Sequence, residues 1–180
     1  MRHILAVLLT FTALPALAAD ACHAQLPKGL KAAVAAAFPA FRLPSVADNL
    51  AEDVAWSKEQ TGNACLGVAK ADFDSNGKPD WLLGLTAKNG NGALVLVALS
   101  LGGKWRLHKL DTWPEGRSRL YVTTDSPGTY DSVLEGEPSE QGEVNRLICP
   151  HAVAVFGATE SSGVAYCYSR KGWQHTWISD

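Results

Sequence analysis

The residues best suited to chemistry lie between Asp72 and Asp80. This stretch reads D-x-D-x-N-G-x-x-D, so oxygen-bearing side chains occupy its first, third, fifth and ninth positions. A hard cation such as Ca²⁺ takes about six to eight oxygen ligands, and Gly77 at position six permits the sharp turn that brings them inward. The backbone carbonyl of Lys78 would supply position seven. We therefore predict a structural Ca²⁺ site with the ligands Asp72, Asp74, Asn76, Lys78 and Asp80.

This loop has two other interpretations. An EF-hand would carry a bidentate glutamate at position twelve, but that position is Leu83, which excludes a helix–loop–helix calcium sensor. The second alternative is a turn whose carboxylates are simply solvated. Three carboxylates that converge on one point repel one another in the absence of a cation, so the sequence favours the calcium site.

The loop resembles the calcium loops of the FG-GAP and VCBS repeat families, which join two strands in secreted bacterial proteins and in integrin-type propellers. The resemblance covers only Ala71 to Trp81, and this chain has one such loop where those families carry several in tandem. The rest of the chain is similar to small exported bacterial proteins that end in a Gly-Trp strand. The resemblance implies a calcium-loop secreted protein and no particular activity.

The sequence gives weaker evidence for catalytic residues than for the metal site. A general acid and base need two carboxylates across a cleft, but closely spaced glutamates beside proline and glycine are typical of a solvated loop. Ser161 and Ser162 fail the G-x-S-x-G pattern and predict a tight polar turn. We predict no enzyme and no catalytic residues. The glutamates considered are Glu135, Glu137, Glu140 and Glu143.

Aromatic residues alternate with a histidine near the C-terminus. Trp173, His175 and Trp177 would share one face of a strand. They could stack on a sugar ring or a partner surface, or they could cover the core. The large apolar area of tryptophan favours the core.

The N-terminus predicts export. Residues 1–18 have a basic start, an apolar run and the small-residue ending Ala16-Leu17-Ala18, as in a signal peptide cleaved after Ala18. We expect no membrane span and a periplasmic or secreted protein. Lipidation of Cys22 is the alternative, but it would leave an odd number of cysteines in an oxidising compartment.

Four cysteines in an exported chain predict two disulfides. If residues 151–168 form a hairpin, Cys149 and Cys167 lie about 20 Å apart along the strands, too far for a bond. This disfavours Cys149–Cys167 and leaves the other two connectivities open. The rival interpretation is a zinc site that joins Cys22-His23 to Cys149-Pro150-His151.

The surrounding elements follow from periodicity. Apolar residues at helical spacing predict helices over 28–38 and 48–59, and β-prone segments separated by turns follow to the end of the chain. We predict an α+β fold, a single domain over 19–180 with N-terminal helices packed on an antiparallel, meander-type sheet. The predicted strands span 66–73, 81–86, 93–101, 104–110, 119–123, 151–156, 163–168 and 173–178.

Two further patterns concern the chain as a whole. Residues 79–105 align weakly with 150–173, which indicates either an internal repeat of three strands or two hairpins with similar turns. The stretch from Asp125 to Val144 is predicted to be a long acidic loop.

Composition limits the function. Sixteen Lys and Arg against eighteen Asp and Glu give a net charge of −2, which argues against nucleic acid and anionic membranes as partners. We expect a small exported, non-catalytic binding or interaction protein with a protein or carbohydrate partner. The alternatives are an inhibitor or immunity-type protein that inserts Asp131 to Glu143 into an enzyme, and a cell-wall hydrolase.

Overall fold

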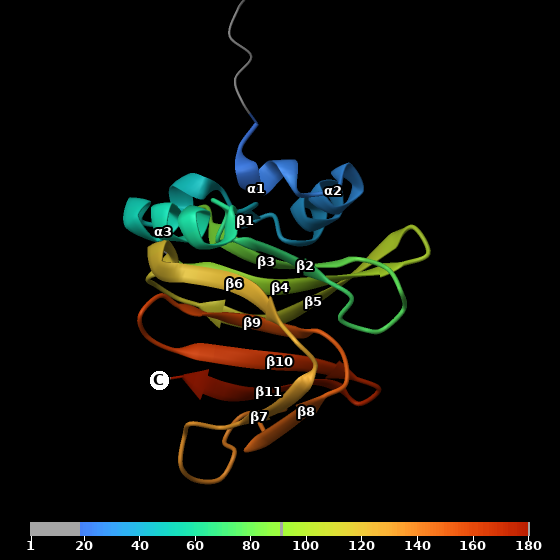
Figure 1. Ribbon diagram of the computed structural model, residues 1–180. Coiled ribbons are helices and arrows are strands. Elements are labelled where there is room, and N and C mark those ends of the chain that lie inside the picture. The colour runs from blue at the N-terminus through green and yellow to red at the C-terminus, as the bar shows by residue number, and fades with distance from the viewer. Residues whose placement is uncertain (1–18, 91, 180) are drawn as a thin grey trace, which may run out of the picture.

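The protein is built mainly of β-strands. The structure is a computed structural model that describes residues 19–90 and 92–179, with 43% strand and 19% helix in three antiparallel sheets (Figure 1). The predicted α+β fold class, with N-terminal helices packed on one meander-type sheet, is therefore wrong. The apolar strands are shared between two sheets that cover each other, and the helices are short.

The first sheet contains five strands. Its order is β1–β3–β4–β5, and β2 pairs with the same edge of β3 as β1 does. Residues 93–99 of β4 are all buried, as expected for a strand that is covered on both faces. The bounds are β1 Phe41–Arg42, β2 Val68–Ala71, β3 Asp80–Ala87, β4 Ala93–Leu101 and β5 Lys104–Trp113.

The second sheet contains four strands in the order β11–β10–β9–β6, and a separate two-stranded hairpin pairs β7 with β8. The prediction of a long acidic loop over Asp125 to Val144 is wrong in part, because β7 lies within that stretch, and β8 begins just after it. The bounds are β6 Leu120–Asp125, β7 Gly128–Asp131, β8 Arg146–Cys149, β9 Val153–Ala158, β10 Gly163–Ser169 and β11 Gly172–Ser179.

The main core lies between the two sheets. Side chains such as Val95 and Val97 from β4 meet Phe156 from β9 and Val164 from β10. A second cluster, around Leu30, covers the outer face of the first sheet, and a third joins the hairpin to the outer face of the second sheet. Four layers result, with helices at one end and the hairpin at the other (Figure 1).

The helices are α1 (Ala21–Ala24), α2 (Lys28–Ala37) and α3 (Ala51–Thr61), and short 3-10 turns occur at Val46–Asp48 and Arg117–Arg119. Both predicted helices are confirmed, as α2 and α3. The two differ in burial, because α2 buries Leu30 and Val34 whereas α3 buries only Ser57.

The segments aligned as a weak repeat, 79–105 and 150–173, form the same unit. Strands β3–β4–β5 make one antiparallel meander and β9–β10–β11 make another. The two meanders lie in different sheets and face each other across the core.

Two disulfides link Cys22 to Cys65 and Cys149 to Cys167, with Cα atoms 5.0 and 5.7 Å apart. The prediction that disfavoured Cys149–Cys167 is wrong, because the chain turns at Pro150 and places β8 in the hairpin rather than in line with β9. The zinc interpretation is also wrong, since all four cysteines are oxidised.

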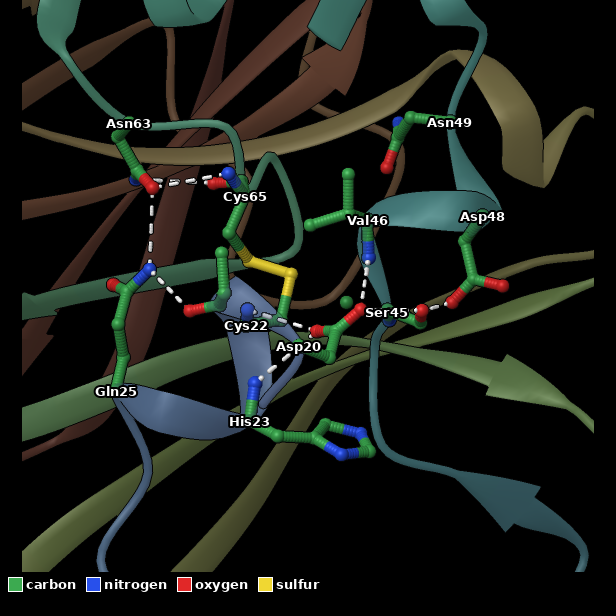
Figure 2. Close-up of a disulfide and its surroundings, with 12 residues drawn as sticks. Asp20, Cys22, His23, Gln25, Ser45, Val46, Asp48, Asn49, Asn63 and Cys65 are labelled. Atoms are coloured by element: carbon green, nitrogen blue, oxygen red, sulfur yellow. Dashed lines mark hydrogen bonds between the residues drawn. A yellow bond between two sulfur atoms is a disulfide. The ribbon is translucent and has the colours of Figure 1, made fainter. Parts of the chain in front are cut away.

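The first disulfide holds α1 in place together with Asp20 (Figure 2). One Asp20 carboxylate oxygen accepts the N–H groups of Cys22 and His23, and the other accepts from Ser45 Oγ and the Val46 N–H. Burial opposes ionisation of Asp20, but these hydrogen bonds outweigh it and keep its pKa below the usual value. The start of the described chain is thus fixed to the segment that follows β1.

A buried arginine joins the two sheets. The Arg117 guanidinium donates to Thr86 Oγ1 and the Gly84 carbonyl on β3, and to the Leu120 carbonyl at the start of β6. Its charge lies 3.8 Å from the carboxylate of Asp48. The guanidinium is paired and hydrogen-bonded, as a buried charge must be.

The predicted signal peptide, residues 1–18, lies outside the described residues. No helix in the described part of the chain is long and apolar enough to cross a membrane.

Candidate metal centre

The loop between β2 and β3 is organised by its own carboxylates. The two oxygens of Asp72 accept the N–H groups of Asn76 and Gly77, at 3.0 and 2.8 Å. Ser75 and Gly77 have positive φ angles of 58° and 76°, which lets the chain reverse within a few residues. The loop is therefore curled around the side chain at its first position.

Asp80, the first residue of β3, is fully buried. Its carboxylate accepts the N–H of Phe73 at 2.9 Å and the N–H of Ser100 at 2.7 Å. Desolvation raises the pKa of Asp80, and the negative charges of Asp74 and Asp72 raise it further. This carboxylate is fixed in position by the protein and disfavoured electrostatically in its ionised form.

Three carboxylates converge at this loop. One oxygen each from Asp72, Asp74 and Asp80 lies within 4.8 Å of the others. A carboxylate has about four lone-pair positions, so an oxygen that accepts one N–H keeps capacity for a cation. The donor set is made of hard oxygens and fits Ca²⁺ or Mg²⁺ rather than a soft metal.

The other two predicted ligands, Asn76 and Lys78, contact each other within the loop. The Asn76 amide nitrogen donates to Asp74 Oδ2 and to the Ser100 carbonyl, and its amide oxygen accepts the Lys78 N–H. These contacts close the loop. The structure therefore brings the three aspartates together and shows Asn76 as a brace between this loop and the end of β4.

The glutamates of the long loop do not converge in this way. Glu143 Oε2 accepts the N–H groups of Ser139 and Glu140, and these bonds lower the pKa of Glu143. Glu140 lies 3.6 Å from the Nε2 atom of His175, and Glu135 and Glu137 are exposed. Ser161 and Ser162 lie in the turn between β9 and β10, as predicted.

The aromatic strand faces the core. His175 is buried and stacks on Tyr166 with ring centroids 4.9 Å apart, while Trp173 and Trp177 are partly buried against the cluster between the sheets. The interpretation that these residues cover the core is confirmed.

Another trio of metal-ligating side chains consists of Cys149, His151 and Cys167. The two cysteines are bonded to each other, so neither offers a thiolate. His151 instead contacts the carbonyl oxygens of Ala152 and Tyr168.

Sequence reasoning missed a groove of about 1010 Å³ between α3, β2 and β6. At its rim is Trp56, whose side chain is 62% exposed. The available signal was an aromatic residue on a helix that has few apolar neighbours at helical spacing.

Comparison with known proteins finds no matching family model, curated protein or solved structure. The resemblance to FG-GAP and VCBS loops rests on residues 71–81 and stays a prediction.

Proposed function

We propose that this chain is an exported, non-catalytic binding protein whose Asp72–Asp80 loop holds a structural Ca²⁺ ion. The observation that carries the calcium site is the convergence of three aspartate oxygens within 4.8 Å, one of them on the fully buried Asp80. Burying a carboxylate beside two like charges is unfavourable, and a divalent cation would offset that repulsion.

The ion would stabilise two connections at once. Asp80 accepts from Ser100 at the end of β4, and Asn76 donates to the carbonyl of the same residue. Asp72, Asp74 and Asp80 would hold the cation. Its positive charge would offset the repulsion between the three carboxylates, and it would take no part in a reaction. Its binding would therefore fix the β2–β3 connection against the neighbouring end of β4.

Export is supported by the two disulfides, which are typical of oxidising compartments. Extracellular calcium modules work with dissociation constants of about 10⁻⁴ to 10⁻³ M, a range that suits a single exposed loop. We place the protein in the periplasm or outside the cell on these grounds.

The test is thermal unfolding of metal-loaded protein. EGTA should lower the melting temperature, and added Ca²⁺ should restore it where equal Mg²⁺ does not, because Mg²⁺ demands near-ideal octahedral geometry and gives up its waters reluctantly. Asp74→Asn should remove most of the Ca²⁺ response, while Glu137→Gln in the long loop should keep it.

Two outcomes would count against the calcium site. One is an equal Ca²⁺ response in wild type and Asp74→Asn. The other is no response to EGTA in a sample whose initial metal content has been established by elemental analysis.

A second candidate function, inhibition of a partner enzyme, is favoured by one surface. Val133 and Leu134 are each 43% exposed and lie next to exposed Glu135 in the long loop. An apolar and acidic insert is the kind of surface that could fill a basic cleft. Capture of one enzyme from envelope extract that Val133→Ser/Leu134→Ser abolishes, with the melting temperature unchanged, would support this function.

A further inference from the structure

The groove beside α3 has walls from four parts of the chain. Helix α3 forms one side, β2 and β6 form the floor, and the turn between β9 and β10 closes one end. Figure 1 shows α3 directly above β6. At about 1010 Å³ the groove is at the upper end of the sizes that hold small-molecule ligands.

Trp56 lines the groove, and its indole ring does not contribute to the core. Trp56 is 62% exposed, and α3 buries only Ser57, so this tryptophan is not a core residue. A flat apolar ring with one polar N–H is suited to stacking on a ligand face. Trp56 is on α3 and lines the groove, so its ring is available to a ligand bound there.

The groove that Trp56 lines also holds hydrogen-bonding groups. Thr159 Oγ1 donates to Asp53 Oδ2 at 2.8 Å, so the Asp53 carboxylate is oriented and keeps acceptor capacity on its second oxygen. Thr123 and Thr124 of β6 also line the groove. The indole of Trp56 and the oriented carboxylate of Asp53 lie in the same groove. Together they suit a ligand that offers both a flat apolar face and several hydroxyl groups.

Charge narrows the ligand class. Glu52, Asp53 and Glu160 line the groove against a single ammonium, that of Lys70. This excess of carboxylates disfavours phosphates, nucleic acid and acidic sugars. Neutral ligands and ligands with an amino group remain.

A peptide strand fits the groove less well. The outer edge of β6 is already used where the Val122 N–H donates to the carbonyl of Leu66, just before β2, at 2.8 Å. Peptide recognition by strand addition needs a row of free backbone N–H and C=O groups, and the Val122 N–H is not free.

We propose that the groove binds a neutral or amino-substituted oligosaccharide. Trp56 stacks under a sugar ring and Asp53 accepts hydrogen bonds from its hydroxyl groups. This assignment rests on the proposed binding function and names its ligand class. It places the binding face at α3 and not at the Trp173–Trp177 strand.

The test is isothermal titration calorimetry with two probes, cellohexaose and a glucosamine hexamer, each measured in Ca²⁺ and in EGTA. At least one probe should bind saturably. Trp56→Ala should weaken that binding about tenfold or more, and Trp56→Phe should recover part of it, because a smaller ring still stacks. Asp53→Asn should weaken it too.

The matched control is Ile148→Ala, which removes another exposed apolar side chain, 71% exposed, on the hairpin layer. Its affinity should equal that of the wild type. Absence of saturable binding by both probes, or equal affinity in Trp56→Ala and wild type, overturns the proposal. A retained Ca²⁺ melting shift in the same samples would show that the calcium site stands even if the saccharide site fails.

Discussion

The 72–80 loop and the 132–145 loop are both rich in carboxylates, but they arrange them in opposite ways. In the short loop, Asp72, Asp74 and Asp80 point at one another. In the long loop, Glu143 is turned back onto the N–H groups of Ser139 and Glu140.

The difference follows from the length of each loop. Both loops join strands that pair directly, β2 with β3 and β7 with β8, but the short loop spans only residues 72–79, so its side chains are forced inward. The long loop spans residues 132–145 and contacts β11 through backbone hydrogen bonds, such as Val144 N–H to the His175 carbonyl, and through Glu140 beside His175. Acidic composition alone therefore does not predict a cation site. The spacing of the carboxylates within a short connection does.

The largest expected effect comes from removing the buried carboxylate. Asp80→Ala leaves the N–H groups of Phe73 and Ser100 without their acceptor, so the free energy of unfolding should fall by about 2–4 kcal/mol in EGTA. Urea denaturation measures this change.

The matched change in the long loop is Glu143→Ala, which should not shift the urea midpoint measurably because Glu143 accepts its bonds at the surface. Equal midpoints for Asp80→Ala and wild type would remove the contrast between the two loops.

A smaller effect is expected from glycine substitution. Gly77 has φ +76° and no atom within 4 Å of an added Cβ, so Gly77→Ala tests backbone strain alone. We expect a loss of about 1–2 kcal/mol in unfolding free energy and a weaker melting response to Ca²⁺.

Gly136→Ala provides the comparison in the long loop. Gly136 also has a positive φ, +114°, and open space around it. The longer connection can relax around the new side chain, so the loss measured by urea denaturation should be smaller than for Gly77→Ala. A larger loss at Gly136 would show that the long loop is the more rigid of the two.

The smallest effect is a local pH response in the long loop. Backbone hydrogen bonds hold the pKa of Glu143 below its usual 4.5, so its ionised form is favoured in the folded state. The contribution is present above pH 4.5 and is lost as the pH falls through the lower folded value.

NMR shifts of the Ser139 and Glu140 amides should follow that titration, and Glu143→Gln should abolish it. Glu137→Gln should leave it intact. Titration of both amides in Glu143→Gln with the wild-type profile would contradict the assignment.

Periodicity predicted the individual elements better than their arrangement. The strand at 93–101 is confirmed, because its seven consecutive apolar residues fit a strand that is buried on both faces. Strand β7 could not be predicted, since Gly128–Asp131 is short and carries no alternating apolar pattern. The division into two facing sheets depends on pairings between distant segments, such as β6 with β9, which local pattern does not encode.

In the candidate site, too, local sequence predicted the residues but not the contacts between distant segments. The spacing of Asp72, Asp74 and Asp80 was sufficient to predict that these side chains meet, while the burial of Asp80 depends on Ser100, twenty residues away. The groove at Trp56 was invisible for a related reason, because its floor is made by strands from different sheets.

The buried Arg117 bears on how the chain folds. Its guanidinium bonds to β3, to the start of β6 and to the segment that contains Asp48, so it leaves water without penalty only when all three are present. Neither sheet can complete this interaction alone. We expect the two sheets to form in one cooperative transition, with a rate limited by contacts between segments far apart in the chain.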